Sequence, residues 1–64
     1  MQEIFTTGEL ADRLSISERT LIRWRVQRVG PSWTKVGHHV RYRREDVEAW
    51  LEAHRQQPVR EASA

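Results

Sequence analysis

The 64-residue chain contains no cysteine, only three glycines and two prolines, and no apolar run long enough to cross a bilayer. Without cysteine, the fold can have neither a disulfide nor a thiolate metal site. The chain has no apolar segment typical of a membrane span or a secretory signal, and we therefore expect it in the cytoplasm. It also lacks internal repeats, and its length predicts one small domain.

Apolar residues are few, so the hydrophobic core of such a domain depends on a small number of large side chains, including three tryptophans. The predicted core comprises Leu10, Leu14, Ile16, Leu21, Trp24, Trp33, Val36, Val40, Tyr42, Val47, Trp50 and Leu51. The polar residues after Arg55 are interrupted by Pro58, a composition typical of disorder. We therefore predict a domain over residues 4–54 and a disordered tail over residues 55–64.

Two helices joined by a short turn are predicted in the first half of the chain. Thr6 and Glu9 have the spacing of a capping box, which predicts a helix over residues 7–14, with Ile4 or Phe5 as its hydrophobic staple. Residues 15–17 form the turn, and Ser17 is the predicted N-cap of a second helix over residues 18–28. Gly30-Pro31 ends that helix. This layout is typical of a helix-turn-helix that reads DNA.

The two faces of helix 18–28 differ in composition. Its inner face comprises Leu21, Trp24 and Arg28, and the charged head of Arg28 is expected to reach solvent. Its outer face comprises Arg19, Ile22, Arg23 and Val26. A surface stripe that mixes arginines with aliphatic residues is unusual for a merely solvated face. It suits a major groove, where arginine binds guanine and a methyl group contacts thymine.

The second half of the chain predicts a β-hairpin and a third helix. Residues 33–36 and 40–42 alternate apolar with polar side chains around Gly37-His38-His39, which is typical of two short strands and a turn. The helix that follows has Glu45 and Asp46 in its first turn, and Arg43 is a poor N-cap for it. Its apolar stripe should close the core; it comprises Val47, Trp50, Leu51 and His54. The predicted fold is mainly α with a small hairpin, a winged helix-turn-helix.

Positive charge is concentrated in one stretch of the sequence. Residues 17–44 contain eight lysines and arginines and one acid, Glu18, a net charge of +7, whereas the whole chain carries +2 and the remaining residues therefore carry −5. A phosphate backbone is a line of negative charge, so its binding depends on basic residues gathered on one face rather than on the net charge of the whole chain. The segregation of charge favours nucleic-acid binding.

Residues 4–53 resemble a known family. The motif runs T-x-x-E-L-A-x-x-L-x-I-S-x-x-T-L-x-R-W from Thr6 and G-P-x-x-x-K-V-G-x-x-V-R-Y-R-x-x-D-V-E-A-W-L from Gly30. This pattern is similar to the small excisionase-like winged helix-turn-helix proteins, relatives of the DNA-binding half of MerR-type regulators. The resemblance implies that helix 18–28 lies in the major groove and that the hairpin, as a wing, contacts an adjacent minor groove.

The resemblance also implies which side chains contact DNA. The recognition-helix candidates that it implies are Arg19, Thr20, Ile22 and Arg23, and the wing candidates are Lys35, His38, His39 and Arg41. Further candidates, for contacts with the DNA backbone, are Thr6, Ser17, Arg25 and Arg43. Many relatives have arginines at the wing tip, where this chain has His38-His39. Histidine is mostly neutral at pH 7, so the wing contact should be weaker and pH-sensitive.

Other functions of these residues have less support. Adjacent histidines in a hairpin point to opposite faces and no cysteine completes a ligand set, so we expect no metal and no other cofactor. Trp24 is expected in the core, with base stacking as the alternative, and Trp33 is either a core residue or a partner-binding anchor. No nucleophile lies beside a plausible base, and we do not expect an enzyme.

The favoured function is that of an excisionase: specific binding and bending of double-stranded DNA, with further copies bound side by side, to direct an integrase. The alternative is a small transcriptional regulator that binds an operator, since the same side chains would serve both roles. A pure protein-interaction module is a third hypothesis, which predicts little salt-dependent DNA binding. MerR-type regulators continue into a dimerisation helix and an effector domain that this chain lacks, so no small-molecule effector is expected.

Overall fold

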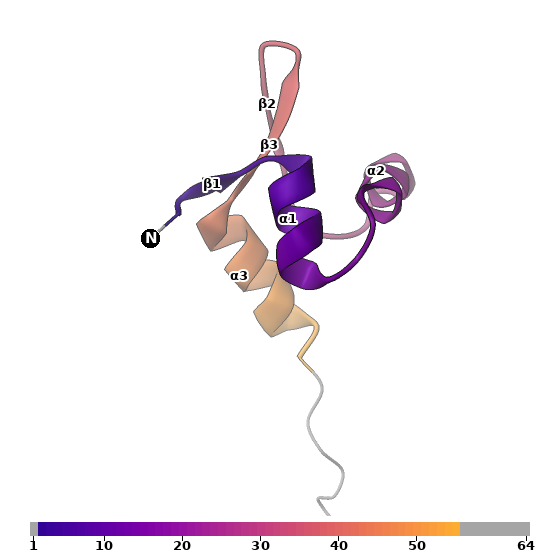
Figure 1. The fold of residues 1–64 in the computed structure, drawn as a ribbon. Helices are drawn as coiled ribbons and strands as arrows, with labels where there is room; N and C mark the ends of the chain where they lie inside the picture. The colour runs from indigo at the N-terminus through magenta and orange to yellow at the C-terminus, as the bar shows by residue number, and fades with distance from the viewer. Residues whose placement is uncertain (1, 56–64) are drawn as a thin grey trace, which may run out of the picture.

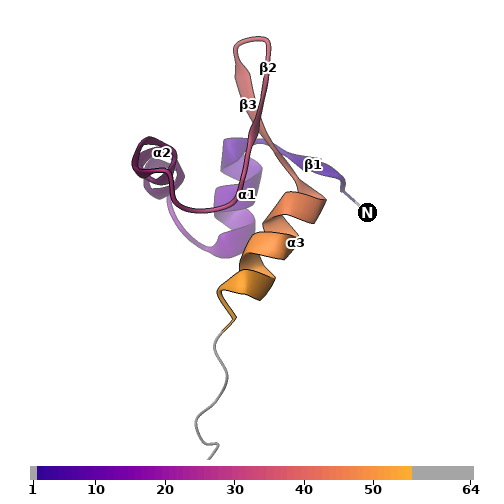
Figure 2. The same cartoon turned by 180° about the vertical axis from the view of Figure 1, so that it is seen from behind.

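The structure, a computed structural model, describes residues 2–55. Its elements are β1 (Ile4–Phe5), α1 (Thr7–Leu14), α2 (Glu18–Gln27), β2 (Thr34–Val36), β3 (His39–Arg43) and α3 (Arg44–Ala53). Helix α1 lies between α2 and α3, and the hairpin of β2 and β3 projects beyond the helices (Figures 1 and 2). This is the expected winged helix-turn-helix. The predicted tail from residue 56 onward lies outside the described residues.

The helix-turn-helix forms through the local signals that the sequence contains. The Thr6 hydroxyl accepts a hydrogen bond from the Glu9 amide (3.1 Å), and the Glu9 carboxylate accepts one from the Thr6 amide (2.9 Å). The Ser17 hydroxyl accepts a hydrogen bond from the Thr20 amide (3.2 Å). Both N-caps satisfy backbone donors that a helix leaves unpaired, and both predicted helix starts are confirmed.

Helix α2 ends slightly before the predicted boundary. Its last residue is Gln27, and Arg28 adopts a left-handed backbone conformation (φ 61°) that ends the helix, before Gly30 (φ 86°) is reached. Arg28 is therefore the C-cap residue, outside the helix, and its side chain is exposed. A left-handed residue turns the chain out of the helix direction, so the next side chain no longer follows the helical wheel.

The sheet has a third strand that the sequence did not predict. The strand order is β1-β3-β2, all antiparallel, with Phe5 opposite Tyr42 and Lys35 opposite Val40. β1 has only two residues, too few to show an alternating pattern. Phe5 is 2% exposed and pairs with the base of the wing, so it belongs to the core rather than serving only as a helix staple.

The core lies where α1, α2, α3 and the sheet meet. Its buried residues are Phe5, Leu10, Ala11, Leu21, Tyr42 and Val47, and Leu14, Ile16, Trp24 and Val40 pack partly buried against them. Trp50 is also half-buried. Each helix thus buries only one narrow stripe, as expected for a small two-layer domain.

Two predicted core residues, Val36 and Leu51, are exposed and their assignment was wrong; Trp33, for which a core position and a partner-binding anchor were the alternatives, is exposed as well. Val36 (58% exposed) lies in the wing, where no further layer covers the strands. Leu51 (44%) lies near the end of α3, and Trp33 (42%) lies in the loop before β2. The periodicity of apolar residues identifies one face of a helix or strand, but it does not show how far neighbouring elements cover that face. Among residues 2–55, no helix has the length and apolar character to cross a membrane.

Candidate nucleic-acid interface

The outer face of α2 is exposed along its length. Arg19 and Arg23 are exposed, and so are the aliphatic residues between and after them, Ile22 (47%) and Val26 (79%). Neither arginine has a hydrogen bond or an ion pair with any other residue in the described part of the chain. An Arg guanidinium presents five donors in a planar fork, so both side chains remain available for an external acceptor.

The opposite face anchors α2 to the body of the domain. Leu21 is fully buried, and the Trp24 ring lies 5.5 Å from that of Trp50 in α3. Gly30 passes directly behind Trp24, where an added Cβ would lie 2.7 Å from the indole ring. Trp24 therefore packs inside the domain, as favoured over the base-stacking alternative.

Thr20 differs from the other predicted recognition residues. It is half-buried, and its hydroxyl lies 3.0 Å from that of Ser17, within the N-cap. The Ser17 hydroxyl also accepts the Thr20 amide hydrogen. Both hydroxyls thus stabilise the start of α2, a role that helix capping explains without DNA.

The predicted wing residues lie on β2, on β3 and in the turn between them. Lys35, His38 and His39 are exposed, and Gly37 supplies the positive φ of the turn (64°). Arg41 is half-buried, and its Nη1 donates a hydrogen bond to the Val40 carbonyl (2.8 Å). The tip of the wing therefore carries three exposed polar side chains, whereas Arg41 lies nearer the domain.

The four residues predicted to contact the DNA backbone all have partners within the domain. The Thr6 and Ser17 hydroxyls belong to helix caps, and Arg43 forms an ion pair with Glu45 (3.2 Å). Arg25 donates hydrogen bonds to Tyr42 and Thr7, a contact that sequence reasoning missed. The pair lies 17 residues apart in the chain and has no periodic signal that could have predicted it.

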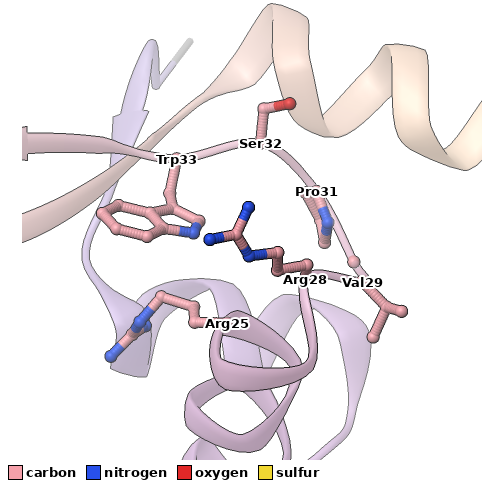
Figure 3. Close-up of a pocket in the computed structure, with 7 residues that line it drawn as sticks. Arg25, Arg28, Val29, Pro31, Ser32 and Trp33 are labelled. Carbon is pink, nitrogen blue, oxygen red and sulfur yellow. The ribbon is translucent and has the colours of Figure 1, made fainter.

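A hollow lies between the end of α2 and the loop before β2 (Figure 3). It is lined by Arg25, Arg28, Val29, Gly30, Pro31, Ser32 and Trp33. The Arg28 side chain extends toward the Trp33 indole, whereas the Arg25 guanidinium points away from Arg28 (Figure 3). Among residues 2–55, no carboxylate lines the hollow, so the positive charge of α2 continues through Arg25 and Arg28 toward the loop before β2.

One acid near the site, Glu9, is engaged in the capping box of α1. The pKa of Glu9 is lowered, chiefly because its carboxylate accepts the Thr6 backbone hydrogen bond, with smaller contributions from the Thr6 and Gln2 side chains and the positive charge of Arg41. Within residues 2–55, no group of three or more histidines, cysteines or acids is placed to hold a metal ion. The exposed cations are thus the chemical feature that this surface offers.

Comparison with protein families identifies the domain. Residues 4–55, most of the chain, match the family described as helix-turn-helix domain. The chain belongs to the helix-turn-helix domain family. This is a DNA-binding family that includes excisionase-like proteins, and membership implies sequence-specific binding of double-stranded DNA. A search of curated proteins found no match.

The structure of this helix-turn-helix domain separates the predicted contact residues into two groups. Those with exposed and uncommitted polar groups or methyl groups are Arg19, Ile22, Arg23, Lys35, His38 and His39. Those already engaged inside the domain are Thr6, Ser17, Thr20, Arg25, Arg41 and Arg43. The first group lies on α2, the second helix of the helix-turn-helix and the one that enters the major groove in this architecture, and on the wing.

Proposed function

We propose that this protein is an excisionase-type accessory factor, which binds specific duplex sites and bends the DNA for a site-specific recombinase. The observation that carries the DNA-reading part of this proposal is the outer stripe of α2. Arg19 and Arg23 stand exposed and free of carboxylates among the described residues, with Ile22 and Val26 beside them. Arginine donors and exposed methyl groups are complementary to guanine and thymine in the major groove.

The wing supplies a second contact in this proposal. The hairpin projects beyond the helices (Figure 1), and Lys35, His38 and His39 are exposed on it. A protein that engages a major groove with a helix and the adjacent minor groove with a hairpin favours DNA curved toward it. Elastic estimates place the cost of such a bend at about 1–6 kcal/mol, which additional backbone and groove contacts offset.

A domain of this size makes few contacts, so we propose that several copies bind side by side. The bent array would then favour assembly of the recombinase complex that performs excision. In this role the protein performs no bond chemistry itself. The alternative, an operator-binding transcriptional regulator, would use the same stripe and the same wing, and the arrangement of binding sites distinguishes the two roles.

The experiment is a selection from random duplex DNA, followed by titration of the selected sites at two salt concentrations and a circular-permutation assay for bending. We expect tandem direct repeats, bent DNA and a log–log salt slope of about −5 if about six phosphates are neutralised. Inverted repeats without bending would instead indicate the regulator. A flat salt response, equal for the wild type and an Arg23→Glu variant, would contradict DNA binding through this face.

A further inference from the structure

One arginine of α2 does not belong to its outer stripe. Arg25 is half-buried, and its Nη1 donates two hydrogen bonds, to the Tyr42 hydroxyl (2.9 Å) and to the Thr7 hydroxyl (3.2 Å). These partners lie on β3 and α1 respectively. A single guanidinium nitrogen therefore joins the recognition helix to the wing strand and to the first helix.

The acceptor on the wing strand is held rigidly. Tyr42 is 1% exposed and lies opposite Phe5 of β1, so the core fixes its ring. It is three residues from His39, where β3 leaves the wing turn. Because the ring is fixed, the phenolic hydroxyl occupies a fixed position relative to the base of the wing.

The apolar contacts of α2 are less directional than this hydrogen bond, and they therefore restrict rotation of the helix less. Leu21 and Trp24 anchor the helix by packing, which is non-directional. A hydrogen bond from a charged donor is short and directional, and it weakens steeply when its angle changes. Among the hydrogen bonds within residues 2–55, the bond from Arg25 to Tyr42 is the one that joins α2 directly to β3.

We propose that Arg25 is a positioning residue that couples the orientation of α2 to the wing, so that helix and hairpin reach adjacent grooves in a fixed relation. Through Tyr42, a small rotation of the helix is opposed by the base of the hairpin. This role differs from the phosphate contact that the sequence predicted for Arg25. The inference rests on the proposed function, because it requires that both α2 and the wing contact DNA.

The test uses a variant that removes only the acceptor. Tyr42→Phe keeps the buried ring and deletes the hydroxyl. Lys35→Ala removes a proposed DNA contact of the wing that is separate from the bond between Arg25 and Tyr42. Ser32→Ala is the matched control, because it deletes an exposed hydroxyl with no hydrogen bond among the described residues. If Tyr42→Phe does not fold, Arg25→Met replaces it and the comparison with Lys35→Ala alone decides, because Arg25→Met deletes the donor of the same bond but also the Thr7 bond and a positive charge.

Affinities for a selected duplex are measured for the wild type, Tyr42→Phe, Lys35→Ala and the double variant, with hydroxyl-radical footprints of each complex. We expect Tyr42→Phe to weaken binding about threefold to tenfold, the range for loss of one hydrogen bond. We also expect Lys35→Ala to cost less affinity in the Tyr42→Phe background than alone, because the wing is already misplaced. Minor-groove protection should weaken while major-groove contacts persist, and Ser32→Ala should bind as the wild type does.

Two results would overturn the positioning role. One is an unchanged affinity of Tyr42→Phe, which a direct phosphate contact by Arg25 predicts. The other is a full, additive cost of Lys35→Ala in the variant background, as expected if the bond contributes only to folding. Failure of the proposed function looks different: the wild type itself would show no salt-dependent binding, and the inference would fall with it.

Discussion

Helices α2 and α3 have the same length and both carry arginines, but their arginines are placed in opposite electrostatic settings. In α2, Arg19 and Arg23 have no carboxylate within ion-pair distance among residues 2–55. In α3, Arg44 pairs with Glu48 (2.7 Å) and with Glu3 (3.7 Å). Arg55, just beyond α3, pairs with Glu52 (3.2 Å), so the cations of this region are neutralised by neighbours.

This contrast has little to do with stability. Exposed ion pairs such as Arg55–Glu52 contribute only about 0–1 kcal/mol each to the free energy of unfolding. They do change what each helix can bind. The carboxylate beside a paired arginine offsets its positive charge and repels a phosphate, whereas an unpaired arginine offers its full charge. The difference between the helices therefore concerns ligand binding, and it favours α2 as the face that meets DNA.

The largest expected effect separates the inner face of α2 from its outer face. Leu21→Ala removes a fully buried side chain, and we expect a loss of about 2–5 kcal/mol in the free energy of unfolding, enough to unfold a small domain. Ile22→Ala, on the exposed face, should change the free energy of unfolding by less than about 0.5 kcal/mol. Urea titrations followed by circular dichroism measure both, and equal losses would contradict the assignment of the two faces.

The second prediction tests the comparison between free and paired arginines directly. Arg23→Ala should weaken specific DNA binding by about 1–3 kcal/mol if its guanidinium reads a base. Arg55→Ala removes an exposed, paired arginine near α3 and should leave affinity within about twofold of the wild type. Fluorescence anisotropy on matched and single-mismatch duplexes measures this. An equal loss on every sequence would make Arg23 a phosphate contact instead of a base contact.

The third prediction concerns the place where the two regions join, at the contact of Trp24 with Trp50. Gly30→Ala introduces a Cβ 2.7 Å from the Trp24 ring at a residue with positive φ, and we expect a destabilisation of at least about 1–2 kcal/mol. Gly37 also has positive φ, but a Cβ there would meet no atom within 4 Å. Gly37→Ala should therefore destabilise less, and thermal melts of both variants report the difference. The reverse order would show that Gly30 does not support α2.

The parts of this structure that follow from local signals were predictable. The Thr6–Glu9 capping box and the Ser17 cap lie within a few residues of the helices they start, so the sequence alone placed both starts. The outer stripe of α2 was also predicted, because a period of 3.6 residues defines a face. The end of α2 was misplaced by one residue, because Arg28 adopts the left-handed conformation that glycine usually supplies.

Features that depend on distant partners were not predictable. β1 exists because Phe5 meets Tyr42, and Arg25 is held because its partners approach from two other elements. From the sequence, Arg25 is recognisable only as a basic residue, and it was therefore predicted to contact the DNA backbone. Whether an arginine is free or engaged depends on what lies within a few ångströms, and this information arises only when the chain folds.

The smallest expected effect concerns Glu9, an exposed acid whose carboxylate is hydrogen-bonded in the capping box of α1. Its pKa is lowered in the folded state by the Thr6 hydrogen bond, so the charged form favours folding. The resulting stability is present above the pKa of the unfolded chain, about 4.3, and is lost as pH falls through the lower folded pKa. We therefore expect the wild-type melting temperature to fall between about pH 5 and pH 3, and to fall less in Glu9→Gln. Asp12→Asn is the control for the loss of one negative charge on α1, because the Asp12 carboxylate has no partner among the described residues. If Glu9→Gln kept the full pH dependence, the Glu9 carboxylate would not be its source.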